Sequence, residues 1–274
     1  MILHSRVPPH FFPRGKQTTI LEMGLKQLLP SQWMIVDEDS PVFLRHKLEQ
    51  KQKRPSQIYR ALPTSKEAQD EFKYLLEKHL IADHRFHRIN DGKLTNPKFD
   101  LDWNYSEADL WSTSLWVQED ICLLEEIENK YVLTAASVCS PSNWDLPSKI
   151  GKPVSEIHKP VPGYRDQMSD KVDRLMSNLK TDRPVQRLNW SIQPNGDLYW
   201  KTGSSDHENI EQKNYWRVER QTLLRMPETK AIVFGIRVFL HSFSVMSKFD
   251  GFSDSIAAII ESLPAEQSAY KNLL

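Results

Sequence analysis

The feature that most constrains this chain is a pair of β-prone runs separated by a short polar turn. Residues 121–124 and 131–134 are rich in apolar and β-prone side chains, and the turn between them is centred on 128–130. This pattern predicts an antiparallel hairpin whose second strand runs to about Val138. Residues 232–240 alternate between two sets of side chains, which is the period of a strand. An antiparallel sheet is therefore the expected centre of the fold.

One more strand and several helices complete the expected framework. Residues 185–192 indicate a strand that ends at a Pro-Asn-Gly turn, with 198–200 as a short partner. Apolar spacing and capping residues favour helices at 65–80, 106–117, 168–179, 217–226 and 253–262. Strands and helices in this order predict the α+β class.

The chain divides into three expected parts. Residues 1–105 form an N-terminal extension, in which 1–60 is an irregular arm with two short helices and 83–105 is a polar loop. Residues 106–245 form the core, and 246–274 form a C-terminal helical tail. The expected architecture is an antiparallel sheet with flanking helices and an N-terminal helical extension.

Charge and hydropathy bear on the classes of partner. The chain has 36 Lys and Arg residues against 36 Asp and Glu residues, so its net charge is zero and nucleic acid is not an expected partner. The longest apolar run, 231–236, is far short of the roughly 20 residues of a membrane helix. Residues 1–24 contain no apolar stretch of signal-peptide length. We expect a cytoplasmic protein without a membrane partner.

Sequence motifs for common catalytic sites are absent. The two cysteines, Cys122 and Cys139, exclude a disulfide scaffold and a cysteine-ligated zinc or iron–sulfur site. The sequence contains no GxGxxG, Walker A, HExxH or GxSxG motif. His79, His84 and His87 lie close together next to the expected polar loop, where solvated histidines are commoner than metal ligands.

His158 lies in an unusually stiff segment. A short helical turn with Ser155 as its expected N-cap is followed by Pro160 and Pro162, which restrict the backbone next to the histidine. A stiffly mounted imidazole suits a metal ligand that presents one nitrogen. The alternative is a histidine that caps the end of the turn, where a positive ring meets the helix dipole. Both interpretations remain open on the residues alone, and capping is the commoner one.

Charged residues also lie beside apolar ones in two later segments. Arg187 and Asn189 share one face of the expected strand, so both side chains can point into a pocket. On the expected helix, Arg217 and Arg220 lie one turn apart, with Glu219 on a flanking face. The alternative is an Arg–Glu network that ties a helix to the sheet, and such networks are commoner than active sites.

Five blocks in a fixed order give the chain a family resemblance. They are VQEDICL at 117–123, CSPSNW at 139–144, IHKPVP at 157–162, RLNW at 187–190 and RVERQTL at 217–223. Together they resemble the haem-dependent oxidative N-demethylase alpha-subunit-like family. The resemblance covers roughly residues 11–243 and is strongest from Val117 onward.

This resemblance implies a PAS-like fold that holds haem b and acts as a monooxygenase. It implies that His158 is the ligand to the haem iron. Arg187 and Glu219 would be the catalytic polar pair on the distal side, and Asn189 and Arg220 would support the cofactor. The substrate would be a small methylated amine, whose methyl group leaves as formaldehyde at the expense of O2.

The resemblance also implies a separate electron donor. The chain has neither a dinucleotide fingerprint nor four cysteines for a cluster, so an external reductase with FMN and a 2Fe-2S cluster is expected. The alternative is a haem-based gas or redox sensor, or a non-catalytic haem-binding module. No output domain or coiled-coil heptad follows residue 243 in the sequence, which favours an enzyme.

Overall fold

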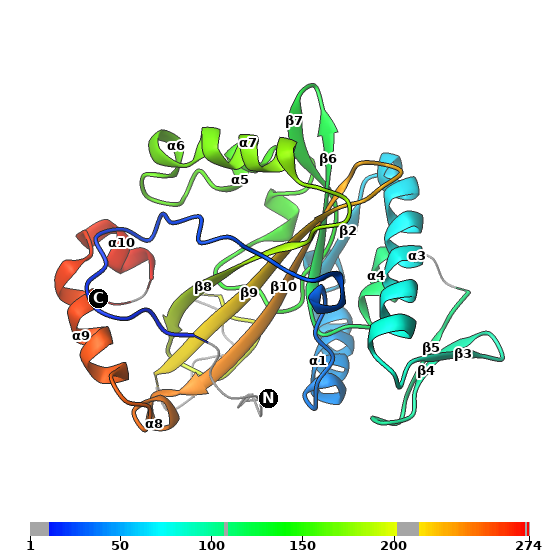
Figure 1. Ribbon diagram of the computed structural model, residues 1–274, viewed down its shortest axis with the longest axis horizontal. Helices are drawn as coiled ribbons and strands as arrows, with labels where there is room; N and C mark the ends of the chain where they lie inside the picture. Colours follow the sequence, from blue (N-terminus) through cyan, green and yellow to red (C-terminus); the bar gives the residue numbers. More distant parts are fainter. Residues whose placement is uncertain (1–10, 107–108, 202–213, 272, 274) are drawn as a thin grey trace.

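A seven-stranded antiparallel sheet lies at the centre of the computed structural model, which describes residues 11–106, 109–201, 214–271 and 273 (Figure 1). In spatial order the strands are β1 (Lys26–Gln27), β8 (Val185–Gln193), β9 (Tyr215–Arg225), β10 (Ile232–Ser242), β6 (Asp120–Ile127), β7 (Lys130–Ser137) and β2 (Tyr59–Ala61). The expected α+β class and antiparallel sheet are confirmed.

The predicted hairpin is the pair β6 and β7. Glu128 and Asn129 both have positive φ, 50° and 60°, at the turn that joins the strands. Two such residues match the right-handed twist of a tight hairpin. The strand predicted at 232–240 is β10, which pairs with β6 on one side and β9 on the other. The second strand of the hairpin ends at Ser137, as expected.

The helix predicted at 217–226 is wrong, because this segment is most of β9. The strand pairs with β10 from Tyr215 to Arg225 and with β8 from Tyr215 to Leu223. Arg, Glu, Gln and Leu are good helix formers, but pairing on both sides outweighs local propensity. In a strand, Arg217 and Glu219 share one face, and Arg220 points to the opposite face.

Two other local expectations are also wrong. The polar loop expected at 83–105 contains a second, three-stranded sheet of β3 (Arg88–Asn90), β4 (Lys93–Asn96) and β5 (Leu101–Asn104). Strands of three or four residues are too short to show a clear period. Residues 198–200 do not pair with β8; instead Trp200 forms a parallel bridge with Ser142.

The helices match the expectations at most positions. They are α1 (Ser40–Lys53), α2 (Pro55–Ile58), α3 (Lys66–Asp83), α4 (Leu110–Ser114), α5 (Val154–Ile157), α6 (Tyr164–Gln167), α7 (Ser169–Asn178), α8 (Phe243–Met246), α9 (Phe252–Ser262) and α10 (Ala265–Tyr270). The helices expected at 65–80, 168–179 and 253–262 are confirmed as α3, α7 and α9. The one expected at 106–117 is only α4, with Asp109 as its cap, and α1 is longer than the expected short helix. Among the described helices, none is long and apolar enough to cross a membrane.

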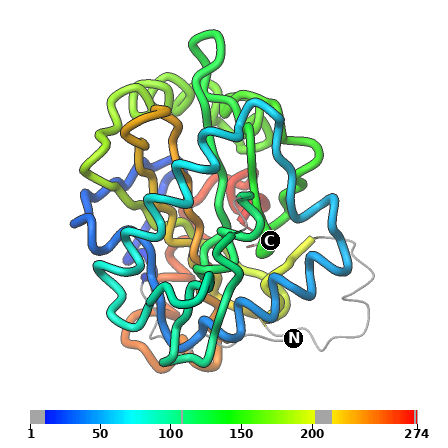
Figure 2. The backbone as a smooth tube through the Cα atoms, turned by 90° about the vertical axis from the view of Figure 1, so that its right-hand side faces the viewer, coloured from blue at the N-terminus to red at the C-terminus, as the bar shows by residue number. Residues whose placement is uncertain are grey.

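Helices cover both faces of the central sheet. On one face, here called the α7 face, Leu223 and Phe234 pack with Met176 and Leu179 of the α7 segment. On the other, the α9 face, residues of β8, β9 and β10 pack against α9 and, farther along, α3; they include Trp190, Trp216, Phe239, Leu224 and Val233. The chain around α1 and α3 lies on the side that Figure 2 turns toward the viewer.

The predicted N-terminal extension contributes directly to the sheet. β1 pairs with β8, and β2 pairs with β7. Arg237 of β10 forms ion pairs with Asp37 and Asp39 at 3.1 and 3.2 Å, and its guanidinium lies over the ring of Phe43 at 4.1 Å. The division of the chain at residues 105 and 245 stays a prediction.

Buried histidines make a testable prediction about acid stability. His46, which binds the carbonyl oxygen of Cys139 through Nε2 at 2.8 Å, and His87 both have a pKa lowered to about 4, chiefly by burial. Between pH 6.5 and 4 the unfolded chain therefore binds more protons than the folded chain, and stability falls as pH falls. Each histidine contributes about 1.4 kcal/mol per pH unit in this range.

Urea unfolding at pH 7.0 and pH 5.5 measures this loss. Asp120 acts in the opposite direction, since burial raises its pKa to about 6 and the folded chain gains a proton there. We expect a net loss of stability at pH 5.5 and a smaller loss in His46→Gln, which keeps a donor for the carbonyl of Cys139. The same pH dependence in both proteins would contradict the role of His46.

Candidate functional site

The segment from α5 to α6 holds the ring of His158 in one orientation. His158 follows the last residue of α5, and its Nδ1 donates a hydrogen bond to the carbonyl oxygen of Val154 at 2.9 Å. After the two prolines, Gly163 has a φ of +77°, and a Cβ there would lie 3.0 Å from Nε2 of Gln167. This turn returns Tyr164 to stack on the imidazole at 4.8 Å between centroids. These contacts orient the ring, and the stiffness of the segment stays a prediction.

His158 both caps the end of α5 and leaves one ring nitrogen open, so features of the capping and the metal-ligand interpretations occur together. The ring does cap α5, but the N-cap is Pro153 and not Ser155, which lies inside the helix. Burial, the nearby Arg187 and Lys149 lower the pKa of His158, although its bond to a backbone carbonyl raises it. The ring is therefore a neutral imidazole with its proton on Nδ1, and Nε2 has no hydrogen-bond partner among the described residues. A fixed tautomer with an open nitrogen is the form that binds a metal ion.

β8 and β9 place three of the predicted residues on the α7 face. Asn189 pairs directly with Glu219 across the two strands, and Arg187 lies two residues earlier on the same face. The expectation that Arg187 and Asn189 share a face is confirmed. The helices α5, α6 and α7 lie over this part of the sheet in Figure 1.

The carboxylate of Glu219 is held by three neighbouring side chains. Oε1 accepts from Nε of Arg217 at 2.9 Å, and Oε2 accepts from Nδ2 of Asn189 at 3.2 Å and Nε2 of Gln221 at 3.1 Å. Burial acts to raise the pKa of Glu219, but these donors and the charge of Lys271 offset burial, and the pKa lies below its usual value. Glu219 is an ionised carboxylate inside the protein at neutral pH.

Arg187 differs from the other inward-pointing arginines because nothing pairs with it. No hydrogen bond or ion pair joins it to another described residue, and its Nε is buried without a partner. Burial lowers its pKa, while Glu219, Tyr164 and Tyr270 act to raise it. An unsatisfied guanidinium in a half-buried position is costly, and such groups are kept where a ligand can complete their bonding.

Arg220 does not join this group. It points to the α9 face, where Nε donates to Oε1 of Gln186 at 2.6 Å and Nη1 donates to the carbonyl oxygen of Trp33 at 3.1 Å. The expected helix placed Arg220 one turn from Arg217, and the supporting role of Arg220 was implied by the family resemblance; in β9 the two arginines lie on opposite faces. Its geometry is that of a residue that fastens the N-terminal segment to the sheet.

The sequence indicated Arg217 only as part of an Arg–Glu network, and it gave no sign of Tyr164 or of the C-terminal residues Tyr270 and Lys271. Arg217 is fully buried, and its Nη2 donates to the carbonyl oxygen of Ser140 at 2.6 Å. This bond brings the CSPSNW block to the RVERQTL block. Lys271 could not be recognised from the sequence, because it lies far from the other motifs and a single lysine after a polar helix shows no distinguishing pattern.

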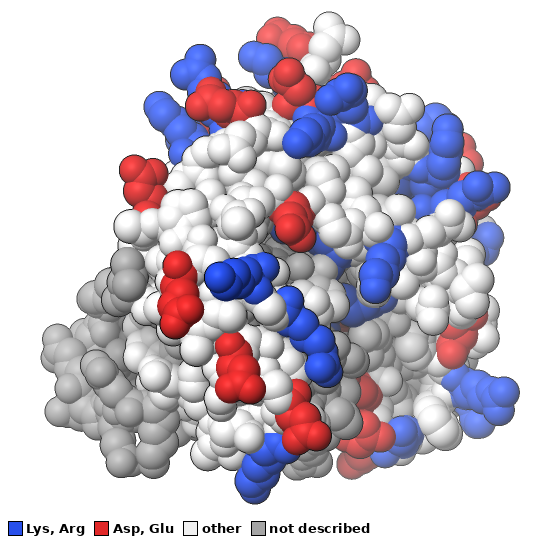
Figure 3. All heavy atoms as spheres, turned by 60° about the vertical axis from the view of Figure 1, so that its left-hand side comes forward, with Lys and Arg blue, Asp and Glu red and all other residues white. Residues whose placement is uncertain are grey.

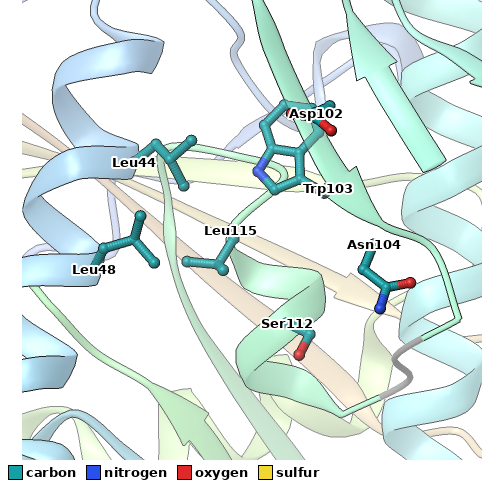
Figure 4. Close-up of a pocket in the computed structure, with 7 residues that line it drawn as sticks. All are labelled: Leu44, Leu48, Asp102, Trp103, Asn104, Ser112 and Leu115. Carbon is teal, nitrogen blue, oxygen red and sulfur yellow. The ribbon is translucent and has the colours of Figure 1, made fainter.

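The histidine cluster and the surface hollows lie elsewhere. His79 and His87 are buried and not solvated as expected: Nδ1 of His79 lies 3.0 Å from Asp83, and Nε2 of His87 lies 3.3 Å from the amide nitrogen of Asn96. The described part of the chain contains no group of three or more His, Cys, Asp or Glu residues that could hold a metal. A hollow of about 220 Å³ between α1, α4 and β5 is lined by Leu44, Leu48, Asp102, Trp103, Asn104, Ser112 and Leu115 (Figure 4).

The face of the molecule in Figure 3, which brings the left-hand side of Figure 1 forward, shows no dominant charge. In Figure 3, Lys and Arg side chains are interspersed with Asp and Glu side chains, without a continuous field of either sign.

In this α+β protein an open imidazole, an unpaired guanidinium and an ionised carboxylate thus lie at one face of the sheet. Residues 24–274 match the family described as haem-dependent oxidative N-demethylase, alpha subunit-like, and the chain belongs to this family. The match extends beyond residue 243, where the sequence resemblance ended, and includes α8, α9 and α10.

The residues present fit a haem group. His158 offers a neutral nitrogen whose orientation is fixed by a backbone carbonyl, as ligands of haem iron require. The orphaned Nε of Arg187 supplies a donor without a protein partner. Cys122 and Cys139 are buried and burial raises the pKa of both thiols, so neither offers a competing thiolate.

The different bonding of Arg187 and Arg217 predicts different effects on stability. Arg217→Met removes the partner of a buried carboxylate and should lower the free energy of unfolding by about 3–5 kcal/mol. Arg187→Met removes an unpaired cation and should leave stability unchanged to within about 1 kcal/mol. Urea unfolding of the apoprotein measures both. Equal losses would mean that Arg187 is part of a structural ion-pair network.

Proposed function

We propose that this chain is the haem-binding subunit of an oxidative N-demethylase that acts on a small methylated amine. The balanced reaction is R–NH–CH3 + O2 + 2 e⁻ + 2 H⁺ → R–NH2 + CH2O + H2O. The observation that supports it best is the convergence of His158, Arg187 and Glu219 at one sheet face in a member of this family. On this proposal the sheet and its flanking helices form a PAS-like haem-binding core.

Three side chains would share the work at the site. Nε2 of His158 would bind the iron, and haem b would supply the activation of O2 and accept the electrons. Arg187 would donate hydrogen bonds from its unpaired Nε to oxygen atoms in the pocket. Glu219 would bind the protonated amine, because its carboxylate is ionised and has the opposite charge. Asn189 would orient Glu219, and the supporting role that the resemblance gave to Arg220 would pass to Arg217.

The two electrons would come from another protein. The chain has two cysteines, both buried, where a 2Fe-2S cluster held by thiolates uses four. The alpha-subunit family name implies other subunits. A reductase with FMN and a 2Fe-2S cluster is the proposed donor.

Replacement of His158 tests the cofactor. The holoprotein should show a Soret band, and His158→Ala should lose it or shift it strongly because the axial nitrogen is gone. His84→Ala is the matched control, since this histidine caps α3 and lies in the separate histidine cluster. Full haem occupancy with an unaltered spectrum in His158→Ala would move the ligand to another residue.

Substitutions of Glu219 and Arg187 should affect turnover in different ways. With dimethylamine, O2 and a chemical or protein reductant, formaldehyde release measures activity. Glu219→Gln should mainly raise the amine concentration needed for half saturation, by about tenfold or more, because it removes the opposite charge. Arg187→Gln should mainly lower the rate at saturating amine.

The same assay separates an enzyme from a sensor. No formaldehyde from any small methylated amine, together with reversible binding of O2 or carbon monoxide that changes the activity of a partner protein, would favour the sensor. A colourless protein from haem-replete cells would contradict both.

A further inference from the structure

The C-terminal segment reaches the candidate site through Lys271. This residue follows α10, and its backbone carbonyl accepts a hydrogen bond from the amide of Ile192 in β8 at 3.2 Å. Only 4% of its surface is exposed. Its Nζ lies 4.9 Å from the centre of the Trp190 ring. Figure 1 shows α10 beside β8, at the end of the sheet opposite α3.

A chain of hydrogen bonds joins the ammonium group of Lys271 to the carboxylate of Glu219. Nζ donates to Oδ1 of Asn189 at 2.7 Å, and Nδ2 of Asn189 donates to Oε2 of Glu219 at 3.2 Å. A further bond from Nζ goes to the backbone carbonyl of Trp190. The three polar side chains therefore form a relay from the C-terminal segment to the carboxylate.

The direction of this relay follows from the chemistry of its two ends. An ammonium group only donates, and an ionised carboxylate only accepts. The amide of Asn189 can satisfy both only with its oxygen toward Lys271 and its nitrogen toward Glu219. If the ammonium group of Lys271 were absent, the amide oxygen of Asn189 would lose its donor, and only the bond to Glu219 would hold the amide in place.

We propose that Lys271 is a positioning residue that orients the carboxylate of Glu219 through Asn189 and thereby determines the affinity of the site for a cationic amine. This inference rests on the proposed function, in which Glu219 binds the protonated substrate. Lys271 does not touch the substrate in this scheme. It acts only through the amide of Asn189.

The electrostatic setting of Lys271 supports the same role. Burial lowers its pKa to about 7; Glu219 acts against this shift and Arg187 adds to it. The charged or titratable groups that face it are Arg187 on β8, Glu219 with its partner Arg217 on β9, and Tyr270 on α10. Above neutral pH the lysine loses its proton, can accept as well as donate, and no longer imposes one orientation on the amide.

Calorimetric titration of the holoprotein with dimethylammonium chloride tests the relay. Lys271→Met keeps the apolar stem and removes the ammonium, so affinity should fall about tenfold or more at pH 6.5, with haem content and the Soret band unchanged. In the unmodified chain, affinity should decline between pH 6.5 and 8.5 as Lys271 loses its proton. Lys271→Arg should keep the affinity of the unmodified chain at pH 6.5 and should not show this decline. Lys248→Met, at an exposed position after α8, is the matched control and should behave as the unmodified chain.

A second variant keeps the test decisive if Lys271→Met does not fold. Asn189→Asp retains an acceptor for Lys271 but has no donor for Glu219, so amine affinity should fall to the level of Glu219→Gln. Unchanged affinity in Lys271→Met or Asn189→Asp would overturn the positioning role while leaving the proposed function in place. Failure of the unmodified holoprotein to bind dimethylammonium would instead overturn the proposed function and the positioning role with it.

Discussion

The antiparallel pairing of β8 with β9 decides which side chains can meet in this protein. The register places Asn189 opposite Glu219 and Leu188 opposite Arg220, so the first pair faces α7 and the second faces the N-terminal segment. A slip of one residue would exchange the two faces. The carboxylate of Glu219 would then lie against the backbone carbonyls that now bind Arg220, and the guanidinium of Arg220 would lie on the α7 face. Pairing of β9 with β10 along its whole length holds the register in place.

Three buried arginines show how the sheet accommodates cations away from solvent. Arg217 is bound by a carboxylate and by carbonyl oxygens, and Arg220 by an amide and by carbonyl oxygens. Arg237 is bound by two carboxylates, although its Nε has no partner. Each joins segments that are distant in sequence, as in the bond from Arg217 to Ser140. Removal of one partner from such a group is costly because the other stays buried. Arg187, on the neighbouring strand β8, is the contrasting case, because it has a buried donor and no partner among the described residues.

The sequence predicted the parts of the structure whose signals are local. The hairpin turn and the alternation of β10 each encode their geometry within a few residues, and both were predicted correctly. The nature of β9 was not predicted, because its residues suit a helix and only distant partners make it a strand. Lys271 could not be connected with Asn189, since 82 residues separate them and no pattern marks the pair. The shared face of Arg187 and Asn189 was predictable because period two is a local property of any strand.

Most of the outer edge of β8 has no partner strand, which has a consequence for association between molecules. β1 pairs with β8 only at Val185 and Gln186, so the rest of that edge would present free amides and carbonyls to any other strand. The C-terminal turn covers this edge at Ile192, with the buried stem of Lys271 packed on Trp190. If this turn detached, the strand would become a template for pairing between chains. Lys271, which binds the side chain of Asn189, thus belongs to the same turn that shields this edge of the sheet from pairing with another chain.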